Sequence, residues 1–351
     1  MVSRLNIAII GAGRIGQAHA QRIINSKAFN QVTLCDPSPP TKAFAKEISA
    51  DYVPNIDMLD QDTIDAYLIA SPNHLHFEHA HFAIETGKPL LIEKPVTGTL
   101  KTAMDLLQIA DSKGATHRIL VGHHRRHSPV LQNSKEIIRS GRLGRLVTAS
   151  VSAQFRKPSS YFEEGPWRTQ SGGGPILINL IHEIDALRYL IGEIQEVTAL
   201  ASYTARQFSV EDTAGIVFRH QNGCLSTVML SDAAATTASW EQTVGEDSTF
   251  YQDRSSFCYQ IAGDQGSFRA PTFELIEFDN EPSWTSEPRT SSISYVHHDP
   301  LIEQIRHFRE VILGRATPLV TLLDGVRNIA IVQAILDSIK HRSTITLDDS
   351  I

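Results

Sequence analysis

Two titratable side chains in this sequence stand in contexts that could support proton transfer. Lys94 follows the apolar run Leu90–Ile92 in the segment LLIEKPVTG, and His182 lies in a helical pattern that begins after three consecutive glycines. An imidazole has an ordinary pKa suited to taking a proton near neutral pH, and the pKa of a partly desolvated ammonium group beside another positive charge is lowered. The pair indicates acid–base chemistry. We expect His182 to be the general base and Lys94 to polarise the reacting group, although the two roles could be exchanged.

A glycine-rich turn near the N-terminus could hold a dinucleotide. Gly11, Gly13 and Gly16 have the spacing G-x-G-x-x-G, after an apolar strand pattern and at the start of a helical one. The first glycine permits a tight turn, the second lets the backbone approach a pyrophosphate, and the third lets the helix pack against the strand. Arg14 and Ile15 would begin a helix whose unpaired N–H groups face the phosphates. The alternative is a glycine turn that binds no nucleotide.

An acidic residue at the end of the next apolar run indicates which dinucleotide would bind. Asp36 stands 20 residues after Gly16, where a carboxylate can accept a hydrogen bond from the ribose 2′-OH of NAD. The same carboxylate would repel the 2′-phosphate of NADP, and no arginine follows soon after it. We therefore expect NAD as the cofactor, with NADP as the less favoured alternative.

Short apolar runs alternate with helical patterns in the first third of the chain. The runs are continuous, as expected for parallel strands covered on both faces, and they occupy Leu5–Ile10, Val32–Cys35, Ala66–Ala70, Leu90–Ile92 and Ile119–Val121. Strands that alternate with helices predict a βαβ sheet, and such sheets bind ligands beyond the carboxyl ends of their strands. Glu93 and Lys94 lie at one such end, and the segment SPNHLH lies at another.

After Gly122 the pattern becomes that of an α+β domain. The segment Leu146–Phe155 is rich in β-forming residues. Two further segments are typical of hairpins, one turning at Asn222–Gly223, a dipeptide suited to a type I′ turn, and one turning near Asp264–Gly266.

Helical patterns accompany these strands. They are expected over Leu177–Leu190, over Pro300–Leu313 with Asp299 as the cap, and over Asp324–His341. The apolar face of the last helix would consist of Val326, Ile329, Val332, Leu336 and Ile339. The predicted fold class is α/β, with an N-terminal Rossmann dinucleotide-binding domain over residues 1–122. A C-terminal α+β domain with a mainly antiparallel open sheet would follow over residues 123–351.

Composition argues against several classes of function. The 351 residues are 41% hydrophobic and 20% charged, with a net charge of −7, so we expect a soluble globular protein and no nucleic-acid partner. We expect no signal peptide, because a strand pattern begins almost at once, and we expect no membrane span, because no apolar run is long enough to cross a bilayer. The three cysteines Cys35, Cys224 and Cys258 lack zinc spacing and cannot all pair. We expect reduced thiols, no metal site and a cytoplasmic protein.

Four motifs in this order, GAGRIG, SPNHLH, EKP and GGGPILINLIHEID, resemble the Gfo/Idh/MocA oxidoreductases, which include glucose–fructose oxidoreductase and inositol dehydrogenase. The resemblance extends over nearly the whole chain. It implies an oxidoreductase that transfers a hydride between NAD and a secondary alcohol of a polyol, sugar or cyclic polyhydroxy compound. It also implies a homo-dimer or homo-tetramer, because partner subunits in the family cover the open face of the second sheet.

The resemblance assigns roles to individual residues. Lys94 matches the active-site lysine, and His182 matches the histidine thought to take the hydroxyl proton. Residues expected to contact the cofactor are Gly11, Gly13, Arg14, Ile15, Gly16, Asp36, Ser71, Pro72, Asn73, His76, Glu93 and Lys94. Residues expected to contact the substrate are Lys94, His124, Arg126, Trp167, Arg168, Asn179 and His182.

One position departs from the family pattern. Members often carry an aspartate four residues before the histidine, and here Ile178 stands there, with Asn179 three residues before it. On an α-helix both positions share a face with His182, so Asn179 could orient the histidine or bond a substrate hydroxyl, but it cannot supply a charge. Two alternatives to the dehydrogenase stay open: a nucleotide-bound sensor without turnover, and an NADP-linked reductase.

Several other side chains have two open interpretations. Arg125 or Arg126 could offer a planar fork to a carboxylate or to hydroxyls, or could belong to a salt-bridged linker. Trp167 could wall the substrate site or pack in the core. Trp240 and Glu241, in a long polar segment without clear period, could lie over the substrate site.

Overall fold

The computed structural model describes residues 5–348, which fold into two compact units. Unit 1 contains the described residues up to His127 together with Asp299–Ile329. Unit 2 contains Ser128–His298 together with the described residues from Ala330 onward. The sequence analysis places a single boundary after residue 122, whereas these units divide after His127 and return the chain to unit 1 for residues 299–329.

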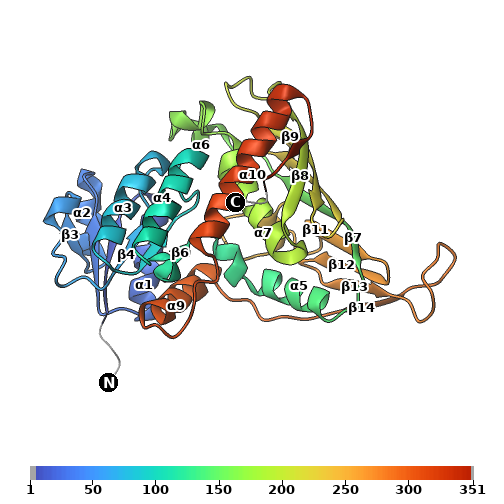
Figure 1. The fold of residues 1–351 in the computed structure, drawn as a ribbon, viewed down its shortest axis with the longest axis horizontal. Coiled ribbons are helices and arrows are strands. Elements are labelled where there is room, and N and C mark those ends of the chain that lie inside the picture. The colour runs from blue at the N-terminus through green and yellow to red at the C-terminus, as the bar shows by residue number, and fades with distance from the viewer. Residues whose placement is uncertain (1–4, 349–351) are drawn as a thin grey trace. The chain divides into compact units, whose positions relative to one another are not determined.

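Unit 1 is built on a sheet of six parallel strands in the order β3-β2-β1-β4-β5-β6 (Figure 1). The strands are β1 Asn6–Ile10, β2 Gln31–Cys35, β3 Asp51–Val53, β4 Ala66–Ile69, β5 Leu90–Ile92 and β6 Ile119–Val121. This is the Rossmann order, and it confirms the predicted βαβ sheet. The sequence analysis missed β3, because this three-residue edge strand is only partly buried and leaves no continuous apolar run.

Helices connect the strands of this sheet. They are α1 Arg14–Ser26, α2 Pro39–Glu47, α3 His76–Glu85 and α4 Leu100–Ser112, with 3₁₀ turns at Ile56–Met58, Asn73–Leu75, Thr116–Arg118 and His124–His127. The inner face of α4 consists of Ala103, Leu106 and Ala110, which are buried. Gly114 follows the helix with a φ of +58°, the left-handed conformation that commonly ends a helix.

The segment 299–329 joins unit 1 through polar contacts. It contains α9 Pro300–Ile312 and the first turns of α10 Leu322–His341. The Asp299 carboxylate caps α9 by accepting from the Leu301 N–H at 2.9 Å, and it also accepts from Arg22 Nε of α1 at 2.7 Å. The Val121 N–H of β6 donates to the Val320 carbonyl at 3.0 Å, so the returning chain also satisfies the sheet edge.

Unit 2 contains a nine-stranded sheet in the order β14-β13-β12-β11-β7-β10-β9-β8-β15. The strands are β7 Leu146–Gln154, β8 Ile194–Ser202, β9 Thr213–His220, β10 Leu225–Ser231, β11 Tyr259–Gly263, β12 Gly266–Ala270, β13 Glu274–Glu277, β14 Arg289–Ser292 and β15 Ile345–Thr346. Only the β7–β10 pair is parallel, so the predicted mainly antiparallel sheet is confirmed.

Both predicted hairpins form, but the turn type predicted for the first is wrong. In the β9–β10 hairpin, Gly223 has a φ of +84°, whereas Asn222 does not have the positive φ that a type I′ turn requires. The Asn222 amide donates to the Ile191 carbonyl at 3.0 Å, and its oxygen accepts from the Cys224 N–H at 3.0 Å. These two contacts hold the Asn222 side chain in place. The hairpin closes instead through a three-residue loop in which Gly223 has the left-handed conformation.

One face of the second sheet is covered by helices (Figure 1). The covering helices are α5 Pro129–Arg139, the π-helical turn Ile176–Leu180, α7 Ile181–Ile191 and the later turns of α10. The other helical segments of unit 2 are short, namely α6 Ser159–Glu163, the 3₁₀ turn Pro166–Thr169 and α8 Trp240–Thr243. The predicted inner face of α10 is wrong at Leu336, which is 41% exposed, whereas Ile335 is buried. The helical repeat of about 3.6 residues shifts the buried stripe by one position along so long a helix.

The opposite face of this sheet is open. Side chains alternate strictly along β10, with Ser226, Val228 and Leu230 buried and the residues between them exposed. The open face carries large apolar side chains from three neighbouring strands, namely Leu200, Val217, Leu225 and Met229. Such a group of exposed apolar side chains is typical of a surface that contacts another protein.

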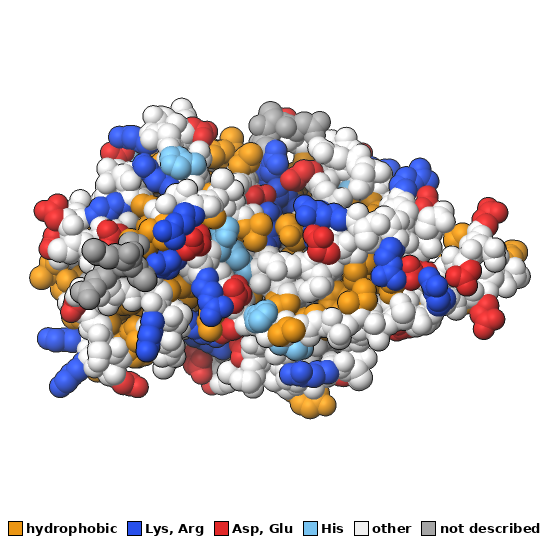
Figure 2. All heavy atoms as spheres, turned by 90° about the horizontal axis from the view of Figure 1, so that it is seen from below, with side chains coloured by type: hydrophobic (Ala, Val, Ile, Leu, Met, Phe, Trp, Pro, Cys, Tyr) orange, Lys and Arg blue, Asp and Glu red, His pale blue; other side chains and the backbone are white. Residues whose placement is uncertain are grey.

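The charged side chains of the protein are mixed in sign. On the face seen in Figure 2, Lys and Arg side chains are interspersed with Asp and Glu side chains. Among the helices of residues 5–348, none combines the length and the apolar character that crossing a membrane requires.

Candidate active site

The glycine loop of unit 1 has the tight turn predicted for Gly11 and the close helix packing predicted for Gly16. Gly11 has a φ of +94°, and a Cβ there would lie 2.4 Å from the Ser71 nitrogen. A Cβ on Gly16 would lie 2.0 Å from the Gly11 carbonyl oxygen, so helix α1 can approach the turn only without a side chain. Gly13 is the N-cap of α1, has no atom within 4 Å of a built Cβ, and no side chain caps the helix. The loop therefore leaves a space bordered by N–H groups that fits a pyrophosphate.

The Asp36 carboxylate lies against this loop. Its Oδ2 accepts from the Ala12 N–H at 2.7 Å, and its Oδ1 accepts from the Ser38 N–H at 2.8 Å. A carboxylate has about four acceptor positions, so two remain for a further donor such as a ribose hydroxyl. In the structure Asp36 thus contacts the glycine loop, whereas the sequence shows only how many residues separate the two.

The loops that follow β4 and β5 are held together by His76. This imidazole is buried, with Nδ1 2.8 Å from the Pro95 carbonyl oxygen and Nε2 2.7 Å from the Ser71 carbonyl oxygen. Burial lowers the pKa of His76, against the opposing effect of the two carbonyls. The Ser71 hydroxyl also lies 2.9 Å from His79 Nδ1. His76 therefore fixes the spacing of two predicted cofactor-contacting loops from beneath, while a contact of its own with the cofactor stays a prediction.

Glu93 is a buried carboxylate directly beneath the Lys94 turn. Its Oε1 lies 2.8 Å from Nε2 of His19, which has no exposed surface, and its Oε2 accepts from the Lys94 N–H at 3.2 Å. Burial alone would raise the pKa of Glu93, but the hydrogen bond from His19 and the positive charges of His19 and Lys94 lower it to about 2. A Cβ on Gly122 would lie 3.0 Å from the Glu93 carboxyl carbon, so the backbone at Gly122 packs directly against the carboxylate.

Sequence reasoning did not single out His19. A signal was present, because His19 lies on the buried face of α1, between Gly16 and Ile23, where a polar side chain requires a partner. The identity of that partner could not be read from the sequence, since Glu93 is 74 residues away along the chain.

The basic segment after β6 is anchored within unit 1. Arg126 Nη2 lies 3.1 Å from Asp324 Oδ1, and its Nη1 donates to the Leu319 carbonyl at 3.3 Å. These contacts agree with the alternative in which Arg126 belongs to a salt-bridged linker. A contact between Arg126 and the substrate stays a prediction. Desolvation lowers the pKa of the neighbouring His124 to about 3, so this imidazole is neutral at physiological pH.

In unit 2, the glycine run sets the start of the helix that carries His182. A Cβ on Gly173 would lie 2.3 Å from the Trp167 carbonyl oxygen, and a Cβ on Gly174 would lie 2.4 Å from Glu211 Oε1. The same Glu211 oxygen accepts from the Ile176 N–H at 2.8 Å and thereby caps the helix start. A π-helical turn over Ile176–Leu180 then precedes α7, in which His182 is buried to 7% exposure. Such π turns often occur at functional sites.

The two tryptophans with open interpretations differ in burial. Trp167 is 52% exposed, so it does not pack in the core, and the adjacent Arg168 guanidinium lies 3.9 Å from the centroid of the Tyr161 ring. Trp240 is buried in the core of unit 2, where its Nε1 donates to Glu246 at 3.2 Å. Its burial argues against the interpretation that Trp240 lies over the substrate site.

Asn179, one turn before His182, is bound by a residue that sequence reasoning missed. The Lys157 ammonium group donates to Asn179 Oδ1 at 2.8 Å. The Asn179 oxygen therefore already accepts one hydrogen bond, while the roles of Asn179 in orienting His182 or in bonding a substrate hydroxyl stay predictions. The sequence offers no signal for this pair, because Lys157 simply follows a strand, where most lysines are exposed.

The parallel sheet, the open glycine loop and the acid at the end of β2 define a dinucleotide-binding Rossmann protein. Residues 5–123 match an oxidoreductase family with an NAD-binding Rossmann fold, and residues 131–269 match the GFO/IDH/MocA C-terminal domain. The chain therefore belongs to the Gfo/Idh/MocA family of oxidoreductases, as its four motifs indicate.

Several relatives have named activities. Inositol 2-dehydrogenase 1 from Paenarthrobacter aurescens is 29% identical, over 78% of this chain and 81% of the relative. An NADP(+)-dependent scyllo-inositol 2-dehydrogenase from Bacillus subtilis is 24% identical, over 99% of this chain and 97% of the relative. The solved structure of levoglucosan dehydrogenase with NADH and levoglucosan has a TM-score of 0.79 at 21% identity, covering 99% of this chain and 100% of that one, which shows a shared fold. The chain spans about two thirds of the length of other curated relatives.

Because the Glu93 carboxylate is buried, the stability of the folded protein depends on pH in the acid range. Its pKa is lowered from 4.5 to about 2 in the folded protein, so its contribution is complete above about pH 5 and is lost as the pH falls toward 2. We expect Glu93→Gln to lower the free energy of unfolding at neutral pH by on the order of 3 kcal/mol, a difference that shrinks in acid. Urea unfolding of both proteins from pH 7 down to the acid limit measures this.

An exposed carboxylate provides the control for this comparison. Glu85→Gln is expected to leave the urea midpoint nearly unchanged across the same pH range, because Glu85 pairs with Lys113 at the surface. A Glu93→Gln difference that stays constant down to the lowest pH would show that the Glu93 carboxylate does not carry the lowered pKa.

Proposed function

We propose that this protein is an NAD-dependent dehydrogenase that oxidises a secondary alcohol of a polyol, a sugar or a cyclic polyhydroxy compound. The observation that supports it most is the Lys94 turn, which is held over a buried carboxylate at the end of β5, and this carboxylate contacts His19 of the helix that begins at the open glycine loop. A lysine with only a solvated surface role would not need a buried carboxylate to hold its backbone. The names of the relatives, which act on inositols and levoglucosan, support the same class of substrate.

In this proposal, residues of the chain bind the dinucleotide, orient the reacting hydroxyl group and take its proton. The loop Gly11–Gly16 and Asp36 hold the dinucleotide, which accepts a hydride when bound. Lys94 donates a hydrogen bond to the reacting hydroxyl oxygen, and Glu93 fixes the Lys94 backbone beneath it. His182 takes the hydroxyl proton, the general-base role that imidazoles most often fill.

Removing either proposed reacting group tests this assignment. We expect Lys94→Ala and His182→Ala each to lower kcat by about 10²–10⁴-fold with little effect on NAD binding, because neither group holds the phosphates. Kcat is measured from nicotinamide absorbance with a panel of polyols, and NAD affinity by calorimetry. Lys113→Ala, a surface lysine paired with Glu85, is the control and should behave as wild type.

A different result would support the sensor alternative. If the wild-type protein binds NAD firmly but oxidises none of the polyols or sugars, the dehydrogenase assignment is wrong. If both variants retain wild-type kcat, then Lys94 and His182 are not the reacting groups.

We also propose NAD rather than NADP as the cofactor, although one relative is named as NADP(+)-dependent. The support is the Asp36 carboxylate at the Ala12 N–H, where a 2′-phosphate would meet a negative charge. We expect Asp36→Ala to reduce the ratio of NAD affinity to NADP affinity by about tenfold or more, since one desolvated hydrogen bond and one repulsion are removed. Titration of both cofactors measures the ratio, and an unchanged ratio would contradict the assignment.

A homo-oligomer built through the open sheet face is part of the proposal. The exposed Leu200, Val217, Leu225 and Met229 give that face the apolar character of a subunit interface. We expect Val217→Arg to yield a smaller species in light scattering coupled to size exclusion, because a charge would be buried without a partner. Met58→Arg, an exposed apolar residue of unit 1, is the matched control. A wild-type protein that is already monomeric would contradict the proposal.

The cysteines favour a reducing compartment such as the cytoplasm. All three are buried, and none of them forms a disulfide within residues 5–348. Burial, followed by the nearby Asp36 and Asp57, raises the pKa of the Cys35 thiol to about 12, and burial raises that of Cys224 to about 11. Such thiols are poorly reactive and contribute as small apolar side chains.

A further inference from the structure

A completely buried imidazole in helix α1 has no part in the proposed mechanism. His19 has no exposed surface, and its Nε2 lies 2.8 Å from Glu93 Oε1. Its Nδ1 is also buried and has no hydrogen-bond partner in the described part of the chain. A buried polar atom without a partner lowers stability, so an apolar side chain would suit this position better if packing alone mattered. The contact with Glu93 is therefore what an apolar side chain could not replace.

His19 lies on the helix that would hold the phosphates of the dinucleotide. It follows Arg14, the first residue of α1, by about one and a half turns. The helix starts tightly against the glycine loop, because a Cβ on Gly16 would lie 2.0 Å from the Gly11 carbonyl oxygen. Since an α-helix is rigid over so short a length, His19 keeps a fixed distance from the N–H groups that would face a pyrophosphate.

Glu93 connects this position to the Lys94 turn. Its N–H donates to the Ile69 carbonyl at 2.9 Å, and its Oε2 accepts from the Lys94 N–H at 3.2 Å. A Cβ on Gly122 would lie 3.0 Å from both the Cα atom and the carboxyl carbon of Glu93, so the backbone there blocks one side of the carboxylate. His19 holds the remaining oxygen. Loss of the His19 contact would therefore free the carboxylate to rotate.

Four ionisable side chains interact with the Glu93 carboxylate. Burial raises the pKa of Glu93, and the hydrogen bond from His19 is the largest of the effects that lower it. The charges that His19, Lys94 and His124 carry when protonated lower this pKa further. Burial lowers the pKa of His76, and Glu93 is among the groups that raise it. Without His19, burial is opposed less strongly, and Glu93 takes up a proton at a less acid pH.

We propose that His19 is a positioning residue of the dehydrogenase reaction, which fixes the Lys94 turn relative to the dinucleotide through the Glu93 carboxylate. The inference rests on the proposed function, because it adds a residue to the same reaction. A carboxylate that rotates or takes up a proton no longer holds the Lys94 N–H, so the ammonium group loses its fixed position at the reacting hydroxyl. The loss falls on kcat rather than on NAD affinity, because the N–H groups of the glycine loop stay in place.

Two substitutions of His19 test the proposal. His19→Leu removes the donor and keeps an apolar volume, whereas His19→Gln can place an amide N–H near the position of the imidazole Nε2. With the polyol that the wild type oxidises fastest, we expect His19→Leu to lower kcat by about tenfold or more, and His19→Gln to restore most of it. NAD affinity, measured by calorimetry, should change by less than about threefold in both variants.

The pH profile of kcat distinguishes positioning from a general loss of stability. We expect the acid limb to lie at least about one pH unit higher in His19→Leu than in the wild type, because Glu93 is protonated sooner. Arg22→Leu is the control on the same helix: it removes the 2.7 Å contact of Arg22 with Asp299 without touching Glu93, and it should keep the wild-type kcat and acid limb.

A double variant and urea unfolding complete the test. His19→Leu combined with Glu93→Gln is expected to lower kcat no more than Glu93→Gln alone, because both changes break one contact. Losses of kcat that add in the double variant would contradict the route through Glu93. A His19→Leu protein that unfolds at lower urea but keeps the wild-type kcat and acid limb would show that His19 only stabilises unit 1. A wild type without turnover would instead remove the dehydrogenase assignment and this role together.

Discussion

The buried carboxylate of Glu93 is the interaction on which the candidate site in unit 1 depends. Removing a carboxylate from water costs several kcal/mol unless donors replace the lost hydration, and here His19 and the Lys94 N–H replace it. His19 belongs to α1, the same helix that begins at the glycine loop. A single rigid helix therefore connects the space for a pyrophosphate with the turn that presents Lys94, and the distance between the two is set by helix geometry rather than by flexible loops.

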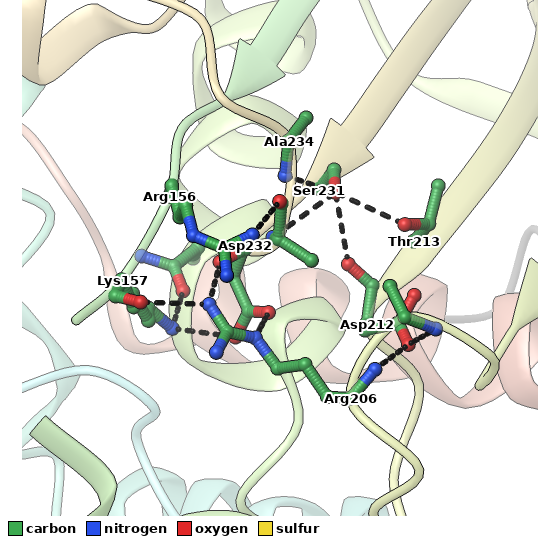
Figure 3. A network of polar contacts seen from close by, with 11 residues as sticks. Arg156, Lys157, Arg206, Asp212, Thr213, Ser231, Asp232 and Ala234 are labelled. Atoms are coloured by element: carbon green, nitrogen blue, oxygen red, sulfur yellow. Dashed lines mark hydrogen bonds and ion pairs between the residues drawn. The ribbon is translucent and has the colours of Figure 1, made fainter. Parts of the chain in front are cut away.

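The same physical constraint recurs in unit 2 with the opposite charge. Lys157 and Arg206 are both largely buried, and both contact the Asp232 carboxylate (Figure 3), while Lys157 also donates to the Asn179 oxygen. Such a network has few alternative arrangements, because breaking any contact leaves a buried charge without a partner. It fixes the orientation of Asn179 on the turn before His182, as Glu211 fixes the start of that turn. Both units thus use buried ionic contacts to orient polar side chains at the ends of regular elements.

Fold and chemistry are specified by different residues in this protein. A solved relative at 21% identity has the same fold over nearly the entire chain, so the architecture depends on the pattern of apolar positions and turns more than on particular side chains. We expect the choice of substrate to depend on a few positions of the candidate site, among them Ile178 and Asn179. The function therefore depends on the site and its contacts, and the fold serves to position them.

The sequence by itself determined the elements that local patterns encode: five of the six parallel strands, the glycine loop, both hairpins and the Asp299 cap. It did not reveal β3, the conformation of Asn222 or the burial of Ile335 in place of Leu336, since each is settled by contacts with other elements. It could not pair His19 with Glu93 or Lys157 with Asn179, nor assign residues 299–329 to unit 1. Only the tertiary structure decided these, because hydrophobic periodicity reports which face of an element is buried, whereas a buried charge is matched to its partner only when distant segments pack together.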